Sequence, residues 1–192
     1  MLSSATLLKS SRLLIRHGRP DDIPAILTYY AENARYLAPF EPLKPSKFYT
    51  KQYWEAELMQ RLTDTKSEKS LKLFIFPLQE PQLLIGTLNF SNCVRGVFQS
   101  CTVGYSLGEA YQGEGYMSEA LQTSIKYVFT QMKFHRISAN YIPHNQRSGT
   151  LLKRLGFVVE GYARDYLYIN GQWQDHILTS LINPASKEQA QQ

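Results

Sequence analysis

The sequence contains few of the residues that build metal centres and disulfide frameworks. Cys93 and Cys101 are its only two cysteines, and their spacing does not match a metal-binding motif. Histidine is also scarce, and its four positions are scattered along the chain: His17, His135, His144 and His176. We therefore expect no metal site and a reduced, cytoplasmic protein, with one disulfide between the two cysteines as the alternative.

Long hydrophobic runs are missing as well, since no apolar stretch approaches the ~20 residues of a transmembrane helix. The 192 residues fit one domain, and a hydrophobic content of 43% is ordinary for a folded, soluble protein. Acidic residues are outnumbered, so the net charge is +5. That balance is compatible with an acidic partner, such as the phosphates of a cofactor or RNA, although basic surfaces often serve solubility alone.

Acidic residues are absent from positions 1–20, where basic residues accompany several serines. This composition is compatible with an organelle transit peptide. We favour a flexible segment followed by a first strand at Arg12–Arg16, because no low-complexity linker comes after it. The predicted division is 1–11 as a flexible N-terminus, 12–183 as one folded domain and 184–192 as a flexible tail.

Hydrophobic periodicity and turn residues predict an α/β domain with one mixed, mostly antiparallel sheet flanked by helices. After the first strand, a helix starts at Asp21 or Asp22, a proline-broken loop occupies Leu37–Pro42, and a second helix spans about 45–62. The remaining elements follow in order: a three-strand meander at 71–77, 83–92 and 99–107, a long helix from Met117, a strand at 136–142, a short helix at 145–155, and a hairpin of 166–169 and 173–181 around Asn170-Gly171.

The most informative stretch is Gln112–Met117, a glycine-rich turn between an apolar run and the long amphipathic helix. Gly113 and Gly115 permit backbone conformations barred to other residues. Backbone N–H groups at a helix N-terminus favour phosphate or pyrophosphate. The plain alternative is a tight turn before a core helix, because a lone Gly-x-Gly is a weak motif. The missing Gly-x-Gly-x-x-Gly spacing argues against a Rossmann dinucleotide site.

Two motifs resemble those of the GNAT acetyltransferases. Gln112 to Gly115 matches the start of the family's pyrophosphate loop, Gln/Arg-x-x-Gly-x-Gly/Ala, although Met117 departs at the last position. A second signature, Asn-x-x-Ser-x-x-x-Leu-x-x-x-Gly-Phe, runs from Asn145 to Phe157. Gly-x-Met-Ser-Glu-Ala is common in one branch, the Rim-type ribosomal-protein-alanine N-acetyltransferases. The stretches that carry this narrower resemblance are 37–42, 89–92, 94–96, 140–145, 160–163 and 170–173, within a match from about Arg12 to Asn183.

The resemblance implies a GNAT fold and transfer of an acetyl group from acetyl-CoA to the N-terminal alanine amine of a ribosomal protein. The implied partner is the N-terminus of a small-subunit ribosomal protein, with the assembling ribosome as its setting, and neither a membrane nor specific DNA. Two alternatives stay open. One is an acetyltransferase for small amines or antibiotics, and the other is an acetyl-CoA-binding accessory protein of ribosome assembly.

The resemblance also assigns cofactor-binding residues. By this resemblance the glycine turn holds the CoA pyrophosphate through its backbone, and a bulge in the preceding strand, within Tyr105–Leu107, offers an N–H to the thioester carbonyl. Many GNAT enzymes protonate the departing thiolate with a tyrosine, but none lies between Asn145 and Phe157, so Ser148 is the substitute. The alternative is that Ser148 only satisfies a helix end. The assigned set is Tyr105, Ser106, Leu107, Gln112, Gly113, Glu114, Gly115, Tyr116, Met117, Asn145 and Ser148.

The base that takes the amine proton is assigned in the same way. In a related Rim enzyme it lies on the strand after the second helix, at the position of Leu167 here. Asp165 lies two residues earlier and shares that face if the strand alternates regularly, so it is the candidate, with Asp175 and His176 as rivals. Candidate walls for the acceptor peptide are Phe40, Tyr141, Tyr166 and Trp173, unless these aromatics are core residues.

Overall fold

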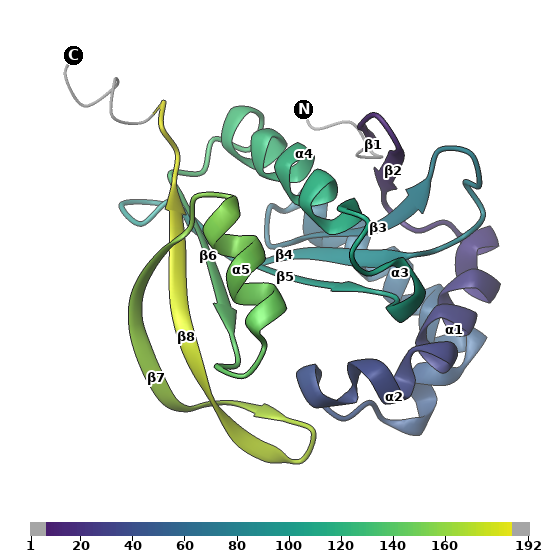
Figure 1. The fold of residues 1–192 in the computed structure, drawn as a ribbon. Helices are drawn as coiled ribbons and strands as arrows, with labels where there is room; N and C mark the ends of the chain where they lie inside the picture. Colours follow the sequence, from purple (N-terminus) through teal and green to yellow (C-terminus); the bar gives the residue numbers. More distant parts are fainter. Residues whose placement is uncertain (1–6, 186–192) are drawn as a thin grey trace.

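The computed structural model describes residues 7–185, which form one eight-stranded sheet flanked by helices (Figure 1). Its strands lie in the order β1-β2-β3-β4-β5-β6-β8-β7, and all neighbours are antiparallel except β5 and β6. The predicted fold class is therefore confirmed. The strands are β1 (Leu7–Lys9), β2 (Leu13–Arg16), β3 (Leu71–Pro77), β4 (Gly86–Val94), β5 (Ser100–Leu107), β6 (Arg136–Tyr141), β7 (Val158–Ile169) and β8 (Gln172–Ile182). The helices are α1 (Ile23–Glu32), α2 (Ala34–Leu37), α3 (Lys51–Lys66), α4 (Tyr116–Thr130) and α5 (Gln146–Arg154), with 3-10 turns η1 (Pro20–Asp22), η2 (Ala38–Phe40), η3 (Ser46–Tyr49) and η4 (Glu109–Tyr111).

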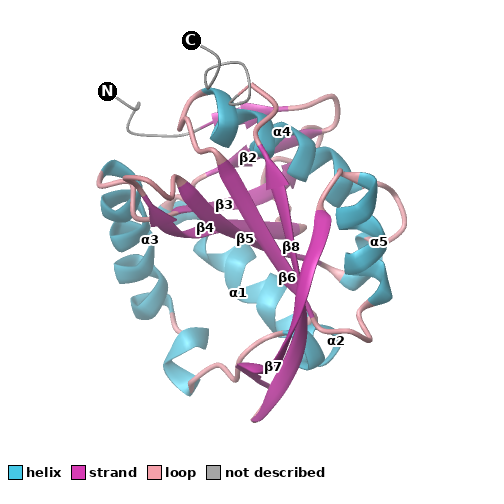
Figure 2. Ribbon diagram, turned by 90° about the vertical axis from the view of Figure 1, so that its left-hand side faces the viewer, coloured by secondary structure: helices cyan, strands magenta, loops and turns pink. Residues whose placement is uncertain are grey.

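Helices cover both faces of the sheet, with α4 and α5 on one face and α1 and α3 on the other (Figures 1 and 2). Side chains of a strand alternate between faces, and β3 supplies both cores in this way. Leu73 and Ile75 pack in the cluster that contains the buried face of α4. Phe74 and Phe76 pack in a second cluster around Trp54, with α1 and α3.

The sheet divides where its two parallel strands part. β5 and β6 are paired only over Ser100–Thr102 and Arg136–Ser138. Beyond that point β5 stays paired with β4 as far as Leu107, and β6 stays paired with β8 as far as Tyr141. The strand ends therefore diverge, and Figure 1 shows α4 beginning close to the end of β5. We call this divergence the fork; its two sides are residues 103–107 and 139–141.

Two helical segments differ from the prediction. The stretch Leu37–Pro42 is not a fully irregular loop, since its first half continues from α2 into η2. Pro39 is tolerated because it stands early in a short helical turn, where its missing N–H breaks no hydrogen bond. The helix predicted at 45–62 is divided at Thr50, whose Oγ1 accepts a hydrogen bond from the Tyr53 N–H at 3.3 Å and starts α3.

Both ends of the folded region also differ from expectation. β1 lies within the segment 1–11 that the sequence indicates to be flexible, and it pairs with β2. β7 begins at Val158 rather than at Tyr166, because β8 offers it partners along most of its length. Residues 1–6 and 186–192 lie outside the described residues, and with them most of the predicted tail.

The buried ion pair between Arg16 and Asp22 generates a prediction for stability. Arg16 Nη2 donates to Asp22 Oδ1 at 2.8 Å, and both side chains are more than 90% buried. Asp22→Ala leaves an uncompensated guanidinium in the interior, so the free energy of unfolding should fall by about 3–5 kcal/mol. Chemical denaturation measures this change. Glu55→Ala, which breaks the exposed pair with Lys51, is the control and should change stability by less than ~0.5 kcal/mol. Equal effects of the two variants would contradict the prediction.

Candidate functional site

The turn before α4 presents backbone N–H groups, and those of residues 113–118 donate to no acceptor within residues 7–185. Gly113 and Gly115 adopt left-handed φ angles of +84° and +78°, which side chains disfavour. Gly115 is the N-cap and has no side chain to bond the helix end, so the first-turn N–H groups keep the arrangement of an anion site. A Cβ added at Gly113 would meet no atom within 4 Å. The turn therefore has the geometry that a pyrophosphate loop requires.

Gln112 ties this turn to the end of β5, because its Nε2 donates to the Leu107 C=O at 2.9 Å. Gly108, the residue after Leu107, donates its N–H to the Ile85 C=O on the β4 side at 2.9 Å. Backbone groups alternate sides along a strand, so the N–H groups of Leu107 and Tyr105 point away from β4 and into the fork.

The prediction of a bulge within Tyr105–Leu107 is wrong. β4 and β5 pair regularly here, and the register shift lies at the other end of the pair, between Ser91 and Val94. The N–H groups of Tyr105 and Leu107 face the fork unpaired for a different reason. Beyond Thr102 they have lost β6 as a partner, because β6 follows β8 instead.

Arg12, the residue before β2, fixes the glycine turn from the side of the first two strands. Its Nη1 donates to the Glu114 C=O at 3.0 Å, and its guanidinium lies 4.4 Å from the centre of the Tyr116 ring. In a trans peptide the C=O and the following N–H point in opposite directions. Holding the Glu114 C=O towards Arg12 therefore turns the Gly115 N–H to the opposite side. Sequence reasoning missed Arg12, because the two residues are 102 positions apart.

Glu119 on α4 completes this clamp. Arg12 Nε donates to Glu119 Oε2 at 2.7 Å, and the N–H of Arg12 and the hydroxyl of Ser11 both donate to Oε1 at 2.8 Å. Burial alone would raise the pKa of Glu119, but hydrogen bonds from residues 10–12 more than offset that effect and lower the pKa to about 2. The carboxylate therefore stays ionised, and the clamp weakens only as the pH falls through the ordinary range of a glutamate towards 2.

Tyr105 of β5 and Ser148 of α5, two residues singled out from the sequence, meet in the structure. Tyr105 Oη lies 2.8 Å from Ser148 Oγ. Asn145 is the N-cap of α5, and its Oδ1 accepts the Ser148 N–H at 3.1 Å. Burial raises the pKa of Tyr105 to about 12, although the hydrogen bond with Ser148 lowers it. The phenol therefore stays protonated and can donate to Ser148 Oγ, which leaves the serine proton available for a ligand.

Ser106 faces the opposite side of the sheet from Tyr105. Its Oγ lies 3.0 Å from Tyr29 Oη of α1 and 3.0 Å from Thr87 Oγ1 of β4. On this face a Cβ added at Gly104 would meet no atom within 4 Å, so β5 is open here inside the fork. The fork thus has two chemically distinct faces, one with Tyr105 and Ser148 and one with Gly104 and Ser106.

The candidate wall residues do not form one surface. The Phe40 ring in η2 lies 6.1 Å from the ring of His144, which follows β6. Tyr166 Oη accepts a hydrogen bond from Asn140 Nδ2 at 3.2 Å. Tyr141 instead packs beneath α5, on the side of Ser148. Trp173 stacks edge-on against Tyr168 near the tip of the β7–β8 hairpin and is 60% exposed, so it is not a core residue.

Asp165 does not lie where regular alternation would place it. Ala163 pairs with His176 and Leu167 with Gln174, so three residues of β7 stand opposite Asp175 alone. Asp165 lies in this bulge with a φ of +46° and an exposed side chain. The argument that put Asp165 on the face of Leu167 is therefore wrong, because a bulge interrupts the period of two.

Asp175 is the acceptor that holds this bulge in place. Its Oδ1 accepts the Asp165 N–H at 2.8 Å, and its Oδ2 accepts the hydroxyl of Tyr162. The hydrogen bond from Tyr162, followed by the one from Asp165, lowers the pKa of Asp175. With both oxygens engaged and its basicity reduced, Asp175 is a poor acceptor for a further proton.

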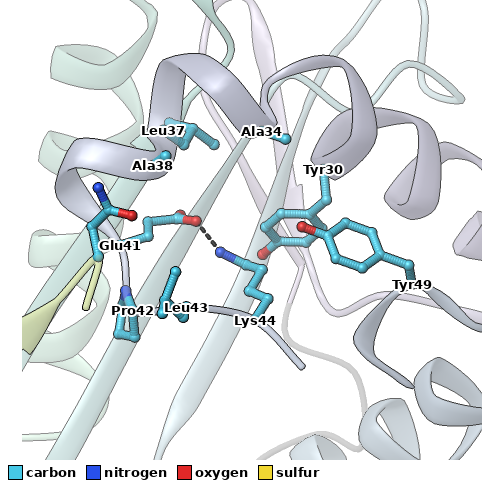
Figure 3. A pocket seen from close by; sticks show the side chains of 10 residues that line it. Tyr30, Ala34, Leu37, Ala38, Glu41, Pro42, Leu43, Lys44 and Tyr49 are labelled. Atoms are coloured by element: carbon cyan, nitrogen blue, oxygen red, sulfur yellow. Dashed lines mark hydrogen bonds and ion pairs between the residues drawn. The ribbon is translucent and has the colours of Figure 1, made fainter. Parts of the chain in front are cut away.

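A cavity of about 170 Å³ is lined by residues of α1, α2, η2 and the loop 41–44, together with Tyr49 of η3 and Asn170 at the tip of the β7–β8 hairpin (Figure 3). The N–H of Asn170 donates to the Glu41 C=O at 3.1 Å and ties the hairpin to this segment. Glu41 pairs with Lys44, whose Nζ lies 5.1 Å from the centre of the Tyr30 ring. The two charges neutralise each other, and most of the remaining lining residues are apolar.

Among residues 7–185, no cluster of histidine, cysteine and carboxylate side chains could hold a metal ion. The helices of that region are all too short or too polar to cross a membrane. Cys93 and Cys101 are both free thiols, so the alternative of a disulfide between them is not realised.

Comparison with known proteins adds independent evidence. Residues 12–158 match the acetyltransferase (GNAT) domain. The [ribosomal protein uS5]-alanine N-acetyltransferase of Escherichia coli (strain K12) is 45% identical over 179 residues, covering 92% of this chain and 91% of that protein. The structure of a ribosomal-protein-S5-alanine acetyltransferase from Vibrio fischeri superposes with a TM-score of 0.88 at 38% identity, over 93% of this chain and 97% of the other. Mycobacterium smegmatis RimJ in complex with CoA-disulfide shares the fold, with a TM-score of 0.83 at 24% identity, over 93% and 86%.

The Arg12 clamp generates a prediction for ligand binding. Arg12→Gln frees the Glu114 C=O and lets the glycine turn relax, so the Kd for CoA should rise about tenfold, the equivalent of ~1.4 kcal/mol. Lys9→Gln removes the same charge from an exposed position of β1 and should leave the Kd within about twofold. Isothermal titration calorimetry measures both constants. Equal weakening in the two variants would mean that only net charge matters.

Proposed function

The chain belongs to the GNAT family of acetyltransferases, and we propose that it acetylates the α-amine of an N-terminal alanine on a small-subunit ribosomal protein. The protein is an acetyltransferase with acetyl-CoA as its acetyl donor. One observation carries the choice of acceptor: a 45% identity, over 92% of this chain, to an enzyme named for the alanine of ribosomal protein uS5. A net charge of +5 suits an acceptor that is presented on an RNA-rich assembling subunit in the cytoplasm.

We assign the CoA pyrophosphate to the N–H groups between Gln112 and Met117. Their orientation is set by Gly113 and Gly115 and by Arg12, as described above. The contribution of Glu114 is then its backbone, since a carboxylate would repel the phosphates. When bound, acetyl-CoA supplies an activated acetyl group. The chain's own residues must hold it, polarise its carbonyl and accept the leaving sulfur.

Polarisation of the carbonyl falls to the end of β5. The N–H groups of Tyr105 and Leu107 face the fork, where no strand competes for them. Preorganised N–H donors at such a position stabilise the negative charge that develops on the carbonyl oxygen. A regular strand edge does this work here, in place of the bulge that the sequence led us to expect.

Ser148 and Tyr105 act on the leaving sulfur as hydrogen-bond donors. A model thiol has a pKa of about 8.5, whereas the pKa of Tyr105 is raised to about 12. Full transfer of the phenol proton to the sulfur is therefore uphill. The arrangement favours a directed chain in which Tyr105 donates to Ser148 and Ser148 donates to the sulfur, with each bond polarising the next.

The proposed function is tested with acetyl-CoA and peptides bearing a free N-terminal alanine, serine or proline, together with small amines. Release of free thiol reports turnover. Turnover that is fastest with the alanine peptide of a small-subunit ribosomal protein supports the proposal. Turnover with small amines alone would keep the acetyltransferase and overturn the acceptor. Binding of acetyl-CoA without turnover of any acceptor would favour the accessory role.

The directed pair generates a separate prediction. Ser148→Ala should lower kcat about tenfold, less than the 10²–10⁴ typical of acid–base groups, because a thiolate is already a good leaving group. The KM for acetyl-CoA should change little, since the pyrophosphate contacts remain. Tyr105→Phe should lower kcat by less than Ser148→Ala, because the serine hydroxyl is retained. Steady-state kinetics separate the two parameters, and an increase confined to KM would show that the pair binds cofactor only.

A further inference from the structure

The base for the acceptor amine is the part of the proposed reaction that sequence reasoning placed on Asp165. That side chain lies in an exposed bulge, and the neighbouring Asp175 has both oxygens engaged. His176, the next residue of β8, is different, because its side chain is only 4% exposed. It stands just beyond the last pair of β6 with β8, Tyr141 with Ile177, so this edge of β8 is not covered by β6.

The tautomer of His176 follows from one contact. Nδ1 lies 3.0 Å from the Gln174 C=O. A carbonyl oxygen only accepts, so Nδ1 carries the proton and donates, and in the neutral ring Nε2 carries the lone pair. No hydrogen bond to Nε2 occurs within residues 7–185, and Nε2 is not among the buried polar atoms without a partner there. Its lone pair is therefore accessible to solvent or to a substrate.

The strand register places His176 on the same face of the sheet as Gly104 and Ser106. Asn140 pairs directly with Leu178, so His176, two residues from Leu178, shares a face with Asn140. Ser138 of β6 pairs with Thr102 of β5. Side chains two residues apart on a strand share a face, so Asn140 on β6 and Gly104 on β5 also lie on one face of the sheet. The imidazole thus lies on the same side of the sheet as Gly104 and Ser106, opposite the side of Tyr105 and Ser148.

Tyr166 contacts both His176 and Asn140. Its ring centre is 5.4 Å from that of His176, and its Oη accepts from Asn140 Nδ2 at 3.2 Å. The bulge at residues 164–166 is what changes the register of β7 beside the imidazole. Tyr166 lies against the imidazole, and Asp175 interacts electrostatically with both His176 and Arg164, although Asp175 is already held by Tyr162.

We propose that His176 is the base that accepts the proton of the acceptor amine, with Tyr166 and Asn140 as positioning residues. This inference rests on the proposed function. The neutral amine nitrogen forms a bond to the acetyl carbonyl carbon, and the carbon–sulfur bond breaks with its electron pair going to sulfur. One proton leaves the nitrogen for His176 Nε2. The imidazolium then returns this proton through water to the thiolate, so that thiol and amide are the products and the enzyme is unchanged.

The decisive variant is His176→Asn. The asparagine amide can donate to the Gln174 C=O as Nδ1–H does, but it offers no basic nitrogen. For a peptide with N-terminal alanine, kcat should fall about 10²–10³-fold, within the range of general-base catalysis. The Kd for CoA should stay within twofold. Asp165→Asn is the matched variant, and it should retain more than a third of the activity. Loss in Asp165→Asn with retention in His176→Asn would overturn the proposal in favour of the bulge carboxylate.

A purely structural role for His176 would not depend on the acceptor's own acidity. The variant is therefore also assayed with a peptide that begins with 3,3,3-trifluoroalanine, whose amine is far less basic. Because this amine loses its proton more readily, the defect of His176→Asn should shrink at least tenfold. An equal defect with both peptides would overturn the proposal.

The wild-type enzyme gives a second test that does not require a folded variant. The pH dependence of kcat/KM is measured with both peptides. A base on the enzyme gives an acid limb at the same pH for the two acceptors, whereas titration of the amine moves the limb to lower pH with the fluorinated peptide. Movement of the whole limb would exclude an enzyme base. If wild type turns over only small amines, the acceptor assignment fails, and the same comparison on amines of different basicity still decides the role of His176.

Discussion

The site depends on a single constraint, which is that β5 and β6 stay paired over only three residues each. Parallel pairing across Ser100–Thr102 fixes the two halves of the sheet, and the departure of β6 with β8 then leaves the last five residues of β5 with one bare edge. In a continuous sheet the N–H groups of Tyr105 and Leu107 would be consumed by a neighbouring strand. Here these N–H groups have no partner on β6, and pairing with β4 along the other edge of β5 holds them in fixed positions.

The same divergence separates two kinds of chemistry. Alternation along β5 sends Tyr105 towards α5 and Ser106 towards α1, so that neighbouring residues serve opposite faces. A donor that enters from one face and an acceptor that enters from the other can therefore meet at one strand edge without sharing a binding surface. In the proposed reaction, His176 on one face accepts the proton of the amine, and Ser148 and Tyr105 on the other face donate hydrogen bonds to the leaving sulfur.

Local sequence patterns predicted the parts of the site that are local. The glycine turn, the cap at Asn145 and most strands could be read from spacing and turn chemistry, because each depends on residues within a few positions. Arg12 could not be found in this way, since its contacts on Glu114 and Glu119 lie 102 and 107 residues away. Asp165 was misplaced because a bulge carries no reliable local signal. Its register is decided by Asp175 on another strand.

The Arg12 clamp also has a consequence for how the cofactor site is made. A loop whose shape depends on residues 11, 12 and 119 cannot reach its binding geometry while the chain is partly synthesised or while β2 is undocked. Helix α4 and strand β5 have to form before the glycine turn between them can reach this geometry. Cofactor affinity is therefore a late property of folding. A molecule whose β1–β2 hairpin has not docked would therefore bind its acetyl donor more weakly than the fully folded protein.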